Sequence, residues 1–429
     1  MSVVRVLLVV LPLVLIPGGC KDPPASRDSS ADAGTAVDAP ADMATGTGDA
    51  GTSACPVHTV SGYSAVDAGV GIKTIDLQRP LFLGAAVRDP QGRTALLLGD
   101  GMFGTAIHEN DVVRVRDDGR LDDSFGDHGW VGLLDSDSGV AMIVVDDLGR
   151  IYLGSSGTAP GAGSTRVRRL TESGTPDASF GTAGDGSVEV EPLLLGAGNT
   201  VWKALGRSLV MTGGAVAVRL DDHGAVAGRI MLDDDNIGAV TGDDHATYVV
   251  GAERPAARAY ALDGSPLPAF GSDGAVPIPP VRPGVRMIPR DMTMGAAGAI
   301  DVLVSYDTFD LAEIVRLTSR GAFDPTWGLA GRAASASLTD NALYSLTHRC
   351  DDVDVAGGGD PGHGVIFTGL FDARGTSWPL STVKWLGGGY GANALYDERD
   401  GAYVLVASTH TPDPQDAGSL IIQMARLAP

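Results

Sequence analysis

Three short Asp-rich turns carry the side chains best suited to chemistry in this chain: DSDSG at 135–139, LDDDN at 232–236 and GDD at 242–244. Clustered carboxylates can bind a hard cation such as Ca2+, which takes about six to eight oxygen ligands from a defined loop. None of these turns has the spacing of an EF-hand or of a nonapeptide repeat. We therefore interpret them as solvated turn caps and assign no metal ligand, and Ca2+ stays the one cofactor that the sequence leaves open.

Nucleophilic or acid–base chemistry has little support in the sequence. The 8 histidines are scattered, and none stands at a recognisable spacing from a nucleophile. The GxSxG, P-loop and dinucleotide-binding patterns are all absent. No catalytic residue is predicted, and the sequence favours a non-enzymatic role without excluding an enzyme.

The chain has 3 cysteines, Cys20, Cys55 and Cys350. No CxxC or HxxxH spacing is present, so a zinc site is not predicted. In an oxidising compartment, Cys55 and Cys350 could form one disulfide that closes a very long loop. The alternative is two unpaired thiols, and the sequence does not decide between them.

A second group of residues recurs along the chain in the signature Gly-x5-(Phe/Trp)-Gly-x2-Gly. The four copies read GRLDDSFGDHG, GTPDASFGTAG, GSPLPAFGSDG and GAFDPTWGLAG. Recurrence at fixed spacing indicates internal repeats. We expect the aromatic residues to pack between neighbouring repeats, with a ligand platform as the alternative. The repeated residues are Gly119, Phe125 and Gly126, then Gly174, Phe180 and Gly181, then Gly264, Phe270 and Gly271, and then Gly321, Trp327 and Gly328.

An arginine precedes most of these copies. We call the first glycine of each copy the marker glycine and add two degenerate markers, Gly224 and Gly375. Arginines stand five residues before four markers, at Arg114, Arg169, Arg219 and Arg316. We expect them to pair with aspartates of the signature, namely Asp122, Asp177 and Asp324. The final Arg426 repeats the same position, which brings the number of repeats to seven.

Each repeat has the content of four short antiparallel strands. Alternating apolar residues around an Asp/Gly turn, as in GVAMIVVDDLGRIYLGSS, predict a hairpin ahead of the arginine strand. One further strand follows the Phe-Gly pair. Four strands per period of about 50 residues are typical of a propeller blade. The sequence therefore predicts an all-β fold, a β-propeller of seven four-stranded blades. The alternative has six blades, with residues 200–280 forming one irregular blade and an insertion.

The phase of the repeats also predicts how the ring closes. The last repeat lacks its outer strand, and residues 69–77, GVGIKTIDL, stand ahead of the first hairpin. We expect this segment to pair with residues 420–427 and so to complete the seventh blade. Such pairing would remove two exposed sheet edges.

The phrases GRLDDSFGDHG and GTPDASFGTAG, preceded by VVDDLGRIYLGSS, resemble the delta-60 repeat, an NHL-like repeat of bacterial β-propellers. The resemblance extends over about residues 70–429. It implies a propeller fold and carries no catalytic residues.

The first residues point to the cell envelope. A short apolar run after Arg5 is typical of an export signal. Gly18 and Gly19 before Cys20 resemble the cleavage and acylation site of bacterial lipoproteins, which implies a lipid at Cys20 and anchoring in the outer membrane. The alternatives are an ordinary secretory signal cleaved elsewhere and an uncleaved apolar N-terminus. The expected organisation is a signal peptide at 1–19, a disordered Asp/Ala/Gly/Thr-rich tether at 20–60 and the propeller at 61–429.

The formal net charge of −22 makes nucleic acid a poor partner. We expect a monomeric, membrane-anchored binding or scaffolding module for a protein or glycan. The alternative function is a propeller enzyme, a lactonase-like hydrolase or a quinone-dependent dehydrogenase, with its site in the central channel.

Overall fold

The protein is described by a computed structural model. The described residues are 72–77, 82–99, 110–133, 140–156, 164–190, 201–232, 236–295, 298–307, 312–335, 342–349, 352–358, 365–371, 374–376, 381–384, 392–397, 402–410 and 420–427.

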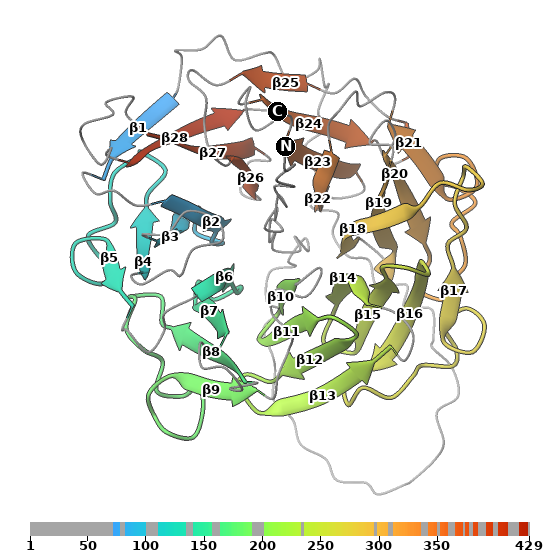
Figure 1. Cartoon of the computed structure of the whole chain (residues 1–429), viewed down its shortest axis with the longest axis horizontal. Coiled ribbons are helices and arrows are strands. Elements are labelled where there is room, and N and C mark those ends of the chain that lie inside the picture. Colours follow the sequence, from blue (N-terminus) through green and yellow to red (C-terminus); the bar gives the residue numbers. More distant parts are fainter. Residues whose placement is uncertain are drawn as a thin grey trace, which may run out of the picture.

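These residues form seven four-stranded antiparallel sheets that surround one axis (Figure 1). Each sheet begins near the axis and ends at the rim, and chain order follows the ring. This arrangement is a β-propeller. The all-β propeller prediction is confirmed, and the seven sheets agree with the seven-bladed form of that prediction.

The strands of the first three sheets are given from the axis outwards. The first sheet has β2 (Phe82–Arg88), β3 (Thr94–Gly99), β4 (Asn110–Val115) and β5 (Trp130–Gly132). The second has β6 (Val140–Val145), β7 (Ile151–Ser156), β8 (Thr165–Leu170) and β9 (Ser187–Val190). The third has β10 (Trp202–Leu205), β11 (Ser208–Gly213), β12 (Val216–Leu220) and β13 (Val226–Met231).

The remaining sheets follow the same order. The fourth has β14 (Ile237–Gly242), β15 (Ala246–Gly251), β16 (Ala256–Ala261) and β17 (Ala275–Pro277). The fifth has β18 (Met287–Met294), β19 (Ile300–Tyr306), β20 (Ala312–Leu317) and β21 (Arg332–Ser335). The sixth has β22 (Ala342–Arg349), β23 (Asp352–Gly358), β24 (Val365–Phe371) and β25 (Ser381–Lys384). The seventh has β26 (Ala392–Asp397), β27 (Ala402–His410), β28 (Leu420–Leu427) and β1 (Ile72–Asp76).

The seventh sheet is built from both ends of the chain. Strand β1 pairs antiparallel with β28, with Ile72 opposite Ala425 and Asp76 opposite Ile421. The predicted closure by an N-terminal strand is therefore confirmed, and it joins the last sheet to the first along the chain.

Residues 200–280 do not form the single irregular blade of the six-bladed alternative. They contain two complete sheets, the third and the fourth. The spacing between markers is compressed here because a turn of only five residues, 221–225, joins β12 to β13.

The hydrophobic core lies between the faces of neighbouring sheets. One buried cluster joins the first three sheets through residues such as Val112, Tyr152 and Trp202. Another joins the seventh sheet to the first and includes Ile75 of β1, Ile422 of β28 and Leu83 of β2. The ring is therefore stabilised mainly at its sheet-to-sheet junctions, where residues of the repeat signature lie.

Candidate functional site

The loop between the third and fourth strands of a sheet folds back onto the third strand. In the first sheet, the Asp122 amide donates to the Arg114 carbonyl at 2.9 Å, and the Arg114 amide donates to the Gly129 carbonyl at 3.0 Å. The φ angles of Gly119, Gly126 and Gly129 are 80°, 54° and 95°. Glycine enters this region without steric cost. The glycines of the signature therefore allow the tight path of the loop.

The aromatic residue of each signature copy is buried, with at most 3% of its surface exposed. In three sheets the arginine of the third strand covers its ring. The distances from guanidinium carbon to ring centre are 4.5 Å for Arg114 over Phe125, 4.6 Å for Arg169 over Phe180 and 4.4 Å for Arg316 over Trp327. A cation over the face of an aromatic ring is attracted to it. Enclosed rings offer no surface to a ligand, so the ligand-platform interpretation is wrong.

The glycine after each aromatic residue bonds to the next sheet. The Gly126 amide of the first sheet donates to the carbonyl of Ser173, which directly precedes the marker Gly174 of the second sheet, at 2.8 Å. The same bond recurs from Gly181 to His223 at 2.8 Å, from Gly271 to Arg320 at 2.8 Å and from Gly328 to Arg374 at 2.7 Å. Each copy of the signature is thus completed by the following repeat.

The marker glycine of that following repeat lies against the aromatic ring. A Cβ atom on Gly174 would come within 2.8 Å of the Val131 side chain and 2.9 Å of the Phe125 ring. Equivalent Cβ atoms would lie 3.0 Å from Phe180 at Gly224, 3.1 Å from Phe270 at Gly321 and 2.9 Å from Trp327 at Gly375. We call the Phe or Trp and the next glycine of one sheet, together with the marker glycine of the next sheet, the aromatic latch.

The predicted arginine–aspartate pairs form in two of the three sheets. The Arg114 Nε lies 2.8 Å from Asp122 Oδ2, and the Arg169 Nε lies 2.8 Å from Asp177 Oδ2. Burial opposes ionisation of Asp122, but hydrogen bonds from Ser124 and the Arg114 guanidinium outweigh it and lower the pKa of this carboxyl. The same balance, with Ser179 and Arg169, lowers the pKa of Asp177.

The third predicted pair, Arg316 with Asp324, is wrong. Arg316 instead binds Asp301 with two hydrogen bonds of 2.8 Å. Asp301 lies directly opposite Arg316 on the neighbouring strand, which favours this two-pronged contact. Asp324 accepts a hydrogen bond from the Thr326 hydroxyl at 2.6 Å and so caps its own loop.

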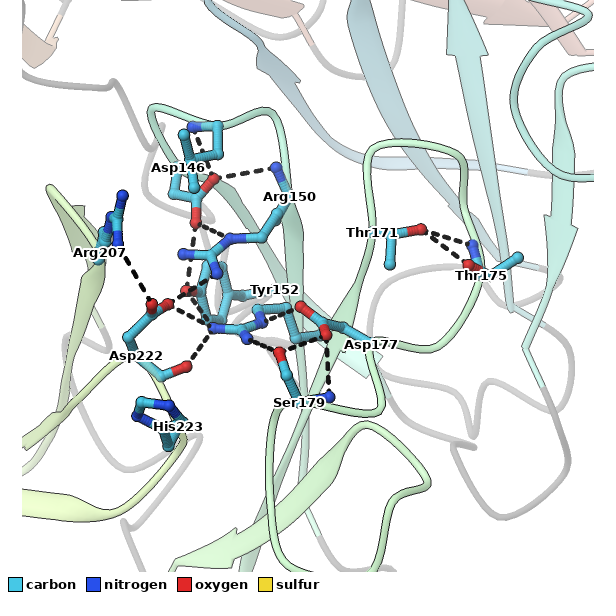
Figure 2. A network of polar contacts seen from close by, with 12 residues as sticks. Asp146, Arg150, Tyr152, Thr171, Thr175, Asp177, Ser179, Arg207, Asp222 and His223 are labelled. Atoms are coloured by element: carbon cyan, nitrogen blue, oxygen red, sulfur yellow. Dashed lines mark hydrogen bonds and ion pairs between the residues drawn. The ribbon is translucent and has the colours of Figure 1, made fainter.

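The junction of the second and third sheets contains an extended polar network (Figure 2). Arg169 donates to the Asp222 carbonyl at 2.7 Å and to the Ser179 hydroxyl at 3.0 Å. Arg150 spans the junction, with contacts of 2.7 Å to both Asp146 and Asp222. Burial opposes ionisation of Asp222, yet Arg150 and Arg169 lower its pKa. Two arginines of one sheet therefore bind one residue of the next.

The first sheet repeats this arrangement. Arg93 binds Asp89 of its own sheet at 2.6 Å and Glu172 of the second sheet at 2.9 Å. Arg114 donates to the Glu172 carbonyl. The sequence patterns behind this arrangement are Asp-x2-Gly-Arg at 89–93 and 146–150 and an acidic residue two positions before the marker glycine. They could have been found beside the aromatic signature.

The third and fourth sheets also depart from the pattern of the first two. In the third, Arg219 donates to the Asp243 carbonyl at 2.7 Å and to the Thr247 hydroxyl at 3.2 Å. In the fourth, Ala259 takes the arginine position, because its amide and carbonyl bond to the loop at Gly274 and Leu267. Arg258, the nearest arginine in sequence, is one residue out of phase.

A non-repeated charged pair lies on the strands nearest the axis. Lys203 of β10 lies 2.6 Å from Asp291 Oδ1 of β18, and its ammonium also donates to the Met292 carbonyl. Asp291 Oδ2 accepts a 3.0 Å hydrogen bond from the Leu346 amide of β22. Burial raises the pKa of Asp291, and Lys203 opposes this shift only in part.

The sequence analysis missed this pair. Its members are far apart in sequence and belong to different repeats. Asp291 also follows a register shift between β18 and β19, so the alternation of side chains along the strand does not predict which way it faces. The available signal was a charged residue within the innermost strand of a repeat, Lys203 in WKAL and Asp291 in MIPRDMTM.

Several predicted sites fall outside the described residues: Cys20, Cys55, Cys350, the whole turn at 135–139 and residues 233–235. Of the remaining Asp-rich turn, Asp243 caps its own hairpin through the amides of His245 and Ala246. Within the described residues, no group of three or more His, Cys, Asp or Glu side chains is placed to hold a metal ion. Those residues also include no helix long and apolar enough to cross a membrane.

No protein family and no curated protein matches the chain by sequence. Among solved structures, the β-propeller domain of the Trilobed protease from Pyrococcus furiosus aligns at 8% identity and a TM-score of 0.46, covering 80% of this chain and 93% of that domain. Sqt1 of Saccharomyces cerevisiae aligns at 10% identity and a TM-score of 0.45, covering 84% and 99%. A KlHsv2 variant whose loop 6CD is replaced by a Gly-Ser linker aligns at 8% identity and a TM-score of 0.40, covering 81% and 99%.

Proposed function

We propose that this protein is a monomeric, outer-membrane lipoprotein whose β-propeller binds a protein or glycan partner. In this proposal residues 1–19 direct export, the Cys20 thiol carries the lipid, residues 20–60 form the tether and residues 61–429 form the propeller of delta-60-like repeats. The ring holds one rigid surface clear of the membrane, where a partner can reach it.

The observation that carries the proposal is a difference between the two ends of the ring: one end holds the repeated contacts between sheets, and the other holds connections of variable length. At the end where third strands pass to fourth strands, the repeated aromatic and charged residues bind the neighbouring sheet. Because adjacent strands are antiparallel, second strands end and third strands begin at the opposite end. The length of the connection between the second and third strands varies at that end. It comprises residues 100–109 in the first sheet but only residues 214–215 in the third. Variable connections on a rigid frame are typical of binding proteins.

The non-repeated charged pair supports a binding role over a reaction centre. Lys203 and Asp291 lie on inner strands, where a propeller enzyme would place its catalytic groups, but both side chains are at least 96% buried and are bonded to one another. Such a pair is suited to holding strands together.

The membrane anchor is tested by mass spectrometry of the mature protein. We expect a diacylglyceryl thioether on Cys20 and its loss, with release from membranes, in a Cys20→Ser variant. An unmodified N-terminus that begins elsewhere would contradict the anchor and leave the binding proposal standing.

The binding role is tested with the full chain, incubated with purified cell-wall glycan and with outer-membrane protein fractions. We expect saturable binding that is lost when residues 157–164 or 100–109 are replaced by Gly-Ser linkers of equal length. The matched control is the double variant Asp118→Ala with Arg120→Ala. Both residues are exposed and lie in the loop between the third and fourth strands of the first sheet, so this variant should bind like wild type. Turnover of a lactone, or quinone-dependent oxidation of an alcohol, would instead support the enzymatic alternative.

A further inference from the structure

The junction between the third and fourth sheets has no aromatic latch. The turn 221–225, DDHGA, contains no Phe or Trp. The backbone of β13 takes the place of the latch, since a Cβ atom on the marker Gly264 would come within 2.2 Å of the Arg229 carbonyl oxygen. Arg219 also reaches the fourth sheet without a carboxylate, through the Asp243 carbonyl and the Thr247 hydroxyl. The repeated contacts of the four junctions that have a latch are therefore reduced here.

The buried charged pair crosses this same part of the ring at its inner radius. The Lys203 side chain starts on β10 of the third sheet and ends at Asp291 of the fifth, so it reaches past the fourth sheet. Asp291 is in turn held by the Leu346 amide of the sixth sheet. A single cluster thus links the two neighbours of the fourth sheet to each other and to the sheet beyond.

We propose that the Lys203–Asp291 pair is a clamp that holds the fourth sheet in the ring in place of the missing latch, and that the ring opens at the junction of the third and fourth sheets when this clamp is broken. The clamp acts near the axis, whereas each latch acts where third strands pass to fourth strands. The third and fourth sheets also share a buried hydrophobic cluster that includes Val210, Ile237 and Tyr260. The clamp adds to this cluster the specific link that the missing latch does not supply.

The charge state of the clamp explains why removing one partner should have a local effect. Lys203→Met leaves the Asp291 carboxyl buried without its counter-charge, and this is the costly way to break a buried pair. Local opening exposes that carboxyl to water, and the strands that must move are β10, β14 and β18. The four junctions with an aromatic latch keep it, because none of their latch residues is changed.

Hydrogen exchange followed by mass spectrometry on the full chain tests the clamp. We expect Lys203→Met to speed exchange in β10, β14 and β18 by at least ~100-fold, with protection in β2–β8 unchanged. Arg150→Met is the matched control, because it breaks a cross-sheet ion pair at the junction of the second and third sheets. Its faster exchange should appear in β6–β9 and at the turn near Asp222 instead.

A second variant keeps the test decisive if Lys203→Met does not fold. Asp291→Asn retains an acceptor for the Leu346 amide and removes the carboxylate charge, and it should show the same local opening. In the double variant Lys203→Met with Asp291→Leu no charge is left unpaired, so exchange in β10, β14 and β18 should be slower than in either single variant. Unchanged exchange in β14 of both single variants, or equal acceleration in all seven sheets, would overturn the clamp.

Discussion

Arg169 shows how much one side chain of the repeat contributes to a junction. Its guanidinium binds Asp177, donates to the Ser179 hydroxyl and to the Asp222 carbonyl, and lies over the Phe180 ring. A lysine could supply the charge but not the planar fork that makes these contacts together. The role of this residue therefore depends on geometry as well as on charge.

Replacing Arg169 should destabilise the protein. We expect Arg169→Met to lower the free energy of unfolding by about 2–4 kcal/mol, below the upper range for buried pairs because Asp222 is partly exposed. Arg169→Lys should recover less than half of this loss. The control is Arg207→Lys, because Arg207 also faces Asp222 but lies 3.9 Å away and is 69% exposed. A thermal melt in which Arg169→Lys matches wild type would contradict this role.

The aspartates of the junctions set the response to acid. The folded-state pKa values of Asp122, Asp177 and Asp222 lie below the ordinary value of 3.8. Their stabilisation is therefore complete above that value and is lost as pH falls through the lowered folded pKa.

Because these three carboxyls lose their stabilising contacts when they are protonated, we expect the Tm to hold near neutral pH and to fall steeply below about pH 4. In Asp177→Asn the acid slope should be shallower, since one of the titrating groups is gone. Thermal melts across pH test this expectation, and parallel pH profiles for the two proteins would refute it.

Ala330 is a position where the sequence departs from the best residue for its backbone. Its φ angle is 55°, between Gly328 at 55° and Gly331 at 84°. A non-glycine residue in this region is strained, and Ala330→Gly relieves the strain at the cost of greater freedom in the unfolded chain. We expect a net gain of about 0.5–1 kcal/mol in a denaturant melt. Ala322→Gly, at a loop position without positive φ, should lose stability, and a loss in both variants would show that Ala330 is not strained.

At the scale of strands, the sequence predicts regular structure better than it predicts partners. The spacing of the markers gave the four-stranded period, and its phase led to the pairing of β1 with β28. The partner of Arg316 could not be found in this way, because Asp301 lies upstream of the signature and becomes its neighbour only through the strand register. The Lys203–Asp291 pair forms because the ring brings strands of three different sheets together. A repeat pattern does not predict such contacts between non-adjacent repeats.

Strand β1 closes the ring, and its removal should be severe. It contributes Ile75 to the core between the seventh and first sheets and covers the free edge of β28. We expect deletion of residues 60–78 to lower the Tm sharply and to cause aggregation, as an exposed edge strand invites. Deletion of residues 24–50, which leaves β1 in place, should not change the Tm. A well-folded monomer without residues 60–78 would contradict the closure.

At the scale of the whole molecule, the signature is a device for joining repeats. Each aromatic latch takes its aromatic ring from one sheet and its marker glycine from the next, so a copy that is continuous in sequence serves two different junctions in space. This explains why the same residues recur around the ring without forming one site. Functional differences are then expected where the repeats differ.

A double-mutant cycle tests this central claim most directly. Gly174→Ala places a Cβ 2.9 Å from the Phe125 ring of the preceding copy, whereas Phe180 belongs to the same copy as Gly174 but serves the next junction. Each of Gly174→Ala, Phe125→Ala and Phe180→Ala should destabilise the protein by itself. Gly184→Ala is the control for backbone strain, because its φ is +73° and no other atom lies within 4 Å of its added Cβ. The account predicts a coupling of about 1 kcal/mol or more between Gly174→Ala and Phe125→Ala, with Gly174→Ala and Phe180→Ala nearly additive. Additivity across the two copies, with coupling inside one copy, would contradict it.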